Sequence, residues 1–259
     1  MEKLEMKYYH FFILFVALLV INICLNNSSL IIKIPIFIIV ALIYYYIIMS
    51  GMKKITSYIN NECDPKKYIT VYNKRLLKKL RNNSINELAI LGNAFILSGE
   101  INSAKINLDL MNQLPIKSIN NKILYYYCQS LFYLEVKNFS SASIALNQLE
   151  EALTYARLLP SAAKKNYESY ILRGRYLINI SNNNYEGAVE YFNTCFLNVK
   201  QNLTKVLVEF SLGEIYMHFE RYNEAKEAFE YVVQNGNTLY KVQLAKEYLK
   251  RISCQQNEK

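Results

Sequence analysis

The sequence predicts an all-α protein, in which an N-terminal two-helix transmembrane hairpin precedes a domain of paired helices. Three observations lead to this prediction. Only 7 glycines and 4 prolines occur in 259 residues, while 52% of the residues are hydrophobic, a composition that favours long helices over a sandwich or barrel with many turns. Two apolar runs of membrane-spanning length stand near the N-terminus. After residue 84, small and large residues recur in an order that suits pairs of amphipathic helices.

The predicted hairpin occupies residues 1–50, with spans at about 8–25 and 30–49. Each run is close to the roughly 17 to 25 residues that cross a bilayer as a helix, and only polar residues lie between them. Lys33 lies near the turn, where its ammonium group can reach the headgroups; a role on an ion pathway is the alternative. A cleaved signal peptide fits less well, because the first apolar run is long and no clear cleavage site follows it.

Residues 51–83 form a basic segment that follows the second span, with nine Lys or Arg residues against Glu62 and Asp64. The turn between the spans has no basic residue. By the positive-inside rule, we expect a cell-membrane protein with two spans and with both termini and the helical domain in the cytoplasm.

A helix over 66–80 is predicted inside this segment, because Asp64 can cap it and Pro65 suits its first position. We expect it to lead into the helical domain and to pack on the first helix pair. The basic side chains here can contact anionic lipid headgroups, and an ordinary solvated surface is the equal alternative. The candidates for headgroup contact are Lys53, Lys54, Lys66 and Lys67.

The helical domain is expected over 84–253, beginning at a capping box of Ser84 and Glu87. Its clearest repeat has small residues, Gly213 and Ala225, where two helices of a pair must approach closely. Large residues fill the remaining space between the helices. In this repeat the large residues are Leu212, Tyr216 and Phe229.

The same order recurs three times before this repeat. The copies contain Leu91, Gly92, Phe95, Ala104 and Leu108; then Ser130 in place of the Gly, with Tyr133, Phe139, Ala142 and Leu146; then Gly174, Tyr185, Ala188 and Phe192. The small residues of the second helices are spaced by 38, 46 and 37 residues, so helices or turns are extended most before the third pair. The pattern resembles tetratricopeptide repeats. The resemblance implies an α-solenoid of about four helix pairs, with a closing helix over about 239–252 and a polar tail over 254–259.

This resemblance also implies a concave groove, lined by the first helix of each pair, that binds a protein or peptide partner. For each groove position, packing within the core is the alternative role. The equivalent positions here are Asn93, Leu131, Arg175 and Glu214, with Tyr127, Phe210 and Met217 one turn away.

Chemistry-bearing motifs are absent from the sequence. The two histidines, His10 and His218, belong to no readable catalytic set, and no phosphate-binding loop or zinc signature occurs. The five cysteines share no metal-ligand spacing and suit reduced, apolar filler positions. We therefore expect no enzyme activity, no cofactor and no metal.

The net charge of +9 is concentrated in the basic segment, so it indicates membrane orientation rather than a nucleic-acid partner. The sequence thus favours a membrane-anchored cytoplasmic scaffold for protein–protein interaction. Two alternatives stay open: a regulator that senses a short peptide, and an accessory subunit of a membrane transport or secretion complex.

Overall fold

The computed structural model describes residues 54–76 and 84–257, together with positions 39, 42, 46 and 50. All regular secondary structure in these residues is helical, which confirms the all-α prediction. Residues 54–60 are helical, and the labelled helices are α3 (Pro65–Leu76), α4 (Ile85–Ser98), α5 (Ile101–Gln113), α6 (Ile119–Glu135), α7 (Phe139–Thr154), α8 (Ser161–Ser181), α9 (Ala188–Asn198), α10 (Asn202–His218), α11 (Tyr222–Asn235) and α12 (Tyr240–Asn257).

Two compact units share the described residues. The larger contains 58–69 and 84–257, and the smaller contains 54–57 and 70–76. The expected spans at 8–25 and 30–49 lie outside the described residues, apart from Ile39, Leu42 and Tyr46, which are helical and exposed. Among the helices that are described, none combines the length and apolar character needed to cross a bilayer.

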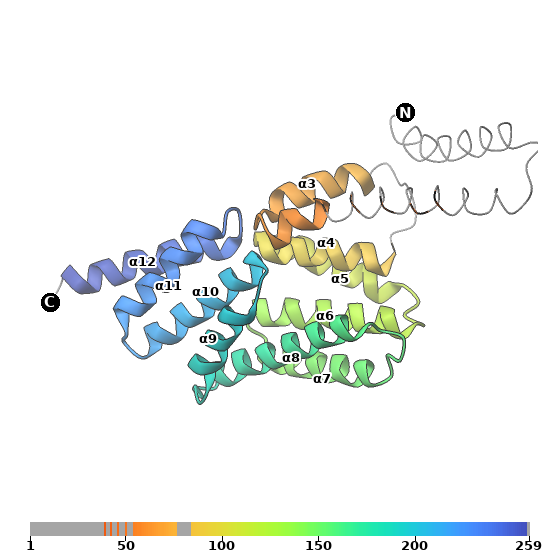
Figure 1. Cartoon of the computed structure of the whole chain (residues 1–259). Coiled ribbons are helices and arrows are strands. Elements are labelled where there is room, and N and C mark those ends of the chain that lie inside the picture. Colours follow the sequence, from red (N-terminus) through yellow and green to blue (C-terminus); the bar gives the residue numbers. More distant parts are fainter. Residues whose placement is uncertain are drawn as a thin grey trace, which may run out of the picture. The chain divides into compact units, whose positions relative to one another are not determined.

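Neighbouring helices along the chain form the packing of the larger unit (Figure 1). α4 pairs with α5, α6 with α7, and α10 with α11. Each pair then packs on the next helix in sequence: α6 contacts α4 and α5, α8 contacts α6 and α7, and α12 contacts α10 and α11. Such an arrangement lets every amphipathic helix bury its apolar stripe against helices close to it in the chain.

The successive helices α8 and α9 depart from this pairing. Their backbones scarcely approach each other, and α9 packs instead on α10. Aromatic rings fill the wider space: Tyr176 of α8 stacks on Tyr191 of α9 with centroids 4.3 Å apart and lies edge-on to Phe192 at 6.3 Å. α8 is also the longest helix described, at 21 residues, and it accounts for much of the wide interval before the third repeat.

Local sequence signals set several helix starts, and those of α4 and α3 were predicted. At α4, the Glu87 amide donates to Ser84 Oγ and the Ser84 amide donates to Glu87 Oε2, at 3.3 and 3.1 Å. The α3 start is capped by Asp64, whose Oδ1 accepts from the Lys67 amide at 3.0 Å. α8 begins at Ser161, directly after Pro160.

The start and end of the larger unit meet at a polar junction. Thr238 Oγ1, shortly before α12, donates to Asp64 Oδ1 at 2.7 Å, so this hydroxyl serves the junction. Asn202 Nδ2 donates to the Asn61 and Asn235 carbonyl oxygens at 3.3 and 3.2 Å. Cys63, fully buried, shares a core cluster with Phe210 and its neighbours in α10 to α12. The segment 58–64 therefore contacts the last helix pair, while the expected packing of the helix over 66–80 on the first pair stays a prediction.

Candidate functional site

Two predicted groove residues of α6 are partly buried and pack against the core. Tyr127 lies edge-on to Tyr170 and Tyr167 of α8, with centroids 4.6 and 5.6 Å away. Burial raises the pKa of the Tyr127 hydroxyl well above its ordinary value of 10.0. Leu131 packs with two core clusters at once. Both side chains pack α6 against neighbouring helices, which is the alternative to partner binding that was stated for each groove position.

The predicted groove residues of α10 are covered by α12. Tyr248 Oη donates to Glu214 Oε1 at 3.1 Å, and Lys241 Nζ lies 4.9 Å from the centre of the Phe210 ring. Phe210 is 3% exposed, and Met217 packs partly buried against the same cluster. Burial raises the pKa of Glu214, while Lys241 and the hydrogen bond from Tyr248 oppose the rise. The closing helix therefore covers the predicted groove residues Phe210 and Glu214 of α10.

Asn93 of α4 is half-buried, and Arg175 of α8 is exposed. Arg175 is thus the predicted groove residue most accessible to a partner. It lines a cavity of about 260 Å³ between α7 and α8. The residues around this cavity are Glu150, Leu153, Thr154, Lys164, Glu168, Ile171, Leu172 and Arg175.

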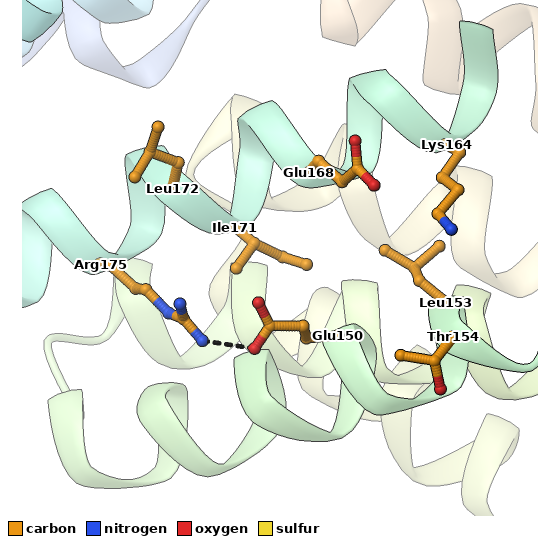
Figure 2. A pocket seen from close by; sticks show the side chains of 8 residues that line it. All are labelled: Glu150, Leu153, Thr154, Lys164, Glu168, Ile171, Leu172 and Arg175. Carbon is orange, nitrogen blue, oxygen red and sulfur yellow. Dashed lines mark hydrogen bonds and ion pairs between the residues drawn. The ribbon is translucent and has the colours of Figure 1, made fainter. Parts of the chain in front are cut away.

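This cavity combines an apolar floor with charged ends. Figure 2 shows Arg175 and Lys164 at opposite ends, with Ile171 between them. Arg175 Nη2 is 2.5 Å from Glu150 Oε2, and about half of each side chain is exposed, at 46% and 52%. Exposed pairs of this kind contribute only about 0 to 1 kcal/mol, so an acidic group of a partner can replace Glu150 at little cost.

Sequence reasoning found Arg175 but missed the rest of this cavity. Glu150 and Leu153 belong to the second helix of one pair, and Lys164 and Ile171 to the first helix of the next. No local motif links residues in two such helices, because their proximity depends on the packing angle between the pairs.

The candidate lipid-contact residues lie in different places. Lys53 is outside the described residues, and Lys54 is exposed in the smaller unit. Lys66 is exposed in the larger unit. Lys67 Nζ pairs with Glu62 Oε2 at 2.9 Å and lies over the Tyr58 ring, and the bond to Glu62 raises the pKa of Lys67 above its ordinary value.

Residues with reactive side chains are dispersed. Over 54–76 and 84–257, no group of three or more His, Cys, Asp or Glu residues is placed to hold a metal ion. Burial raises the pKa of the Cys63 thiol to about 11 and that of Cys128 to about 12, which disfavours their thiolates. His218 stacks on Tyr185 with centroids 4.0 Å apart.

Comparison with protein-family models, with curated proteins and with solved structures finds no match to this chain. The functional assignment therefore depends on the residues and geometry described above.

Proposed function

We propose that this chain is a membrane-anchored scaffold that binds a protein partner and catalyses no reaction. In this proposal the N-terminal apolar runs form the transmembrane hairpin, and the helical domain is a tetratricopeptide-like solenoid on the cytoplasmic side. The observation that carries the proposal is the recurrence of helix pairs, each packed on the next helix in sequence, because stacked pairs of this kind present extended surfaces for partners.

The proposed binding site is the cavity between α7 and α8. Its floor, made by Leu153 and Ile171 with Leu172 at the rim, suits one large apolar side chain of a partner. Arg175 and Lys164 suit an acidic group beside that side chain, since a guanidinium binds a carboxylate with two hydrogen bonds. The expected ligand is thus a segment of a protein in which an apolar residue adjoins an acidic one.

Site-specific crosslinking tests this proposal. A photoreactive amino acid at Leu172, 47% exposed in the cavity, is expected to crosslink one partner segment of the stated composition in intact cells. The same group at Ile106, 60% exposed on α5, is the control and should not capture it. Arg175→Ala should reduce the crosslink about tenfold, from the loss of the charge-assisted hydrogen bonds to the partner's carboxylate. Equal capture from both positions, or no effect of Arg175→Ala, would contradict the proposed site.

The membrane topology has a separate test. A tag at the C-terminus should resist protease added to intact cells and be cleaved once the membrane is breached. A tag that is cleaved in intact cells would place the domain outside and overturn the cytoplasmic scaffold.

A regulator that senses a short peptide is a second candidate function. It is supported by the position of α12, which covers Phe210 and Glu214 of α10. Lys241 Nζ of α12 is 2.8 Å from Glu135 Oε1 of α6, and only 23% and 17% of these side chains are exposed. This pair joins the closing helix to the second repeat. A ligand that bound the inner side of α10 would have to displace α12, which would change the curvature of the array.

A further inference from the structure

An exposed basic and apolar cluster lies at one end of α6, α7 and α8, next to the cavity between α7 and α8. Two loops form this end: the α5–α6 loop and the α7–α8 loop (Figure 1). They are neighbours, because Ile119 at the start of α6 shares a core cluster with Ala156 and Leu159 of the α7–α8 loop. The loop cluster consists of Lys117, Lys122, Arg157, Leu158 and Lys165.

Leu158 is the most exposed large apolar residue described, at 98%, and nearby Tyr155 is 67% exposed. Most exposed leucines rest on a helix surface, where part of the side chain is covered. Leu158 instead lies in the α7–α8 loop directly after Arg157, and Lys165 follows near the start of α8, while the last turn of α7 carries no basic residue. An apolar tip flanked by lysine and arginine is the arrangement that inserts into the interface of a bilayer.

The four basic residues of the loop cluster are exposed, and none forms an ion pair with an acidic side chain of the described residues. The nearest acidic residues along the chain, Glu151 and Glu168, lie about one turn or more inside α7 and α8. Glu150 is already held by Arg175. Glu168 follows Lys165 by three residues in α8, but the four basic residues outnumber the two nearby carboxylates, so the loop cluster carries a net positive charge around an apolar tip.

We propose that the loop cluster binds an anionic lipid surface, with Leu158 in the interface and the basic residues on the headgroups. Each Lys or Arg near such a surface contributes about 1 kcal/mol, so four of them together increase binding by about 10³-fold. This site goes beyond the proposed scaffold function, because it concerns lipid rather than a protein partner and uses none of the residues of the α7–α8 cavity.

The chain contains no tryptophan, which permits a direct test. The full chain with Leu158→Trp is incorporated into vesicles of phosphatidylcholine, alone or with 30% phosphatidylglycerol, that carry brominated acyl chains. With phosphatidylglycerol, we expect the emission of this variant to shift to shorter wavelength and to be quenched by bromine. The shift should vanish at about 1 M salt, where the screening length falls to about 3 Å.

Leu197→Trp is the matched control, since Leu197 is 82% exposed on α9, outside the loop cluster. Its emission should be the same in both vesicles. A second variant combines Leu158→Trp with Lys117→Gln, Lys122→Gln, Arg157→Gln and Lys165→Gln, and it should lose the shift while keeping its helical circular dichroism. The proposal is overturned if Leu158→Trp behaves like the control, if the quadruple change has no effect, or if the shift requires an added protein.

Discussion

The α10–α11 pair and the α8–α9 connection show how one sequence pattern produces two kinds of packing. At α10, a Cβ on Gly213 would lie 2.6 Å from Phe229 Cε1 of α11, so the two helices meet at the glycine as predicted. At α8, a Cβ on Gly174 would lie 2.8 Å from Leu146 Cδ1 of α7. The glycine of the third repeat therefore faces the preceding pair and not α9.

This difference shows that a small residue in the pattern indicates a close contact between helices but does not indicate which helix makes that contact. Phe229 is fully buried and stacks on Tyr248 of α12, with ring planes 2° apart, which fixes α10, α11 and α12 together. Between α8 and α9, the Tyr176 and Tyr191 rings stack in the same manner but fill the space that backbone contact would otherwise occupy. α10 and α11 thus pack in direct contact, whereas aromatic rings separate α8 from α9.

Gly213→Ala is expected to have the largest effect, because the new methyl group must displace the buried Phe229 ring. We expect the free energy of unfolding to fall by about 2 to 3 kcal/mol, as in overpacked cores. Urea unfolding of the full chain in mild detergent measures this.

Gly92→Ala is the matched control for that substitution. A Cβ on Gly92 would lie 3.8 Å from Asn107 Cβ, an ordinary contact, and alanine is favoured in a helix by up to about 1 kcal/mol. We expect this variant to be as stable as the wild type or more stable. Equal destabilisation by the two substitutions would show that α10 and α11 do not meet at Gly213.

Tyr176→Ala should loosen the packing between α8 and α9, which depends on the stacked rings of Tyr176 and Tyr191. The loss of the stack on Tyr191 is expected to cost about 1 to 2 kcal/mol. Hydrogen exchange should quicken in α9 and in the second half of α8, while α4 and α5 keep their protection. Faster exchange spread evenly over all helices would count against a local connection.

Gly174→Ala tests which helix the third glycine faces. The added methyl group meets the end of the Leu146 side chain, which can shift more easily than the Phe229 ring, so we expect a loss of about 1 kcal/mol. In Leu146→Ala the side chain that would clash with the new methyl group is absent. Adding Gly174→Ala to that variant should therefore cause no further loss in the free energy of unfolding. If the loss persists there, Gly174 does not face Leu146.

Glu214→Gln is expected to have the smallest effect and to depend on pH. Burial raises the pKa of Glu214 above its ordinary value of 4.5; Lys241 and Lys137 oppose the rise, and Glu135 adds to it. Because the pKa of Glu214 is higher in the folded than in the unfolded protein, this group stabilises the folded state below pH 4.5. That stabilisation is lost as the pH rises through the pKa that Glu214 has in the folded state. The stability of the variant relative to wild type should thus be higher at pH 7 than at pH 4. Unfolding at both pH values measures this difference, and a constant difference would contradict the burial.

Local chemistry made some of this fold predictable. The reciprocal bonds of Ser84 and Glu87, and the start of α8 after Pro160, need only neighbours in sequence. The close contact at Gly213 was also predictable, because α10, which contains this glycine, and α11 are consecutive in the sequence. The predicted anchor over 8–25 and 30–49 stays a prediction, since those spans lie outside the described residues.

Contacts between distant residues were not predictable. Thr238 could cap a helix by its position, but Asp64, 174 residues earlier, accepts its hydrogen bond. Glu214 was placed in an open groove because the pattern does not encode where α12 lies. The cavity between α7 and α8 was missed for a similar reason, since Glu150 and Arg175 are brought together by the angle between two pairs.

Hydrogen exchange of the wild-type chain tests most directly the claim that α8 and α9 pack less tightly on each other than α10 and α11 do. The account predicts that amides in α9 and in the second half of α8 exchange faster than those in α10 and α11. Equal protection of α8, α9, α10 and α11 would contradict it, because the ring-spaced connection would then be as tight as the pair that meets at Gly213.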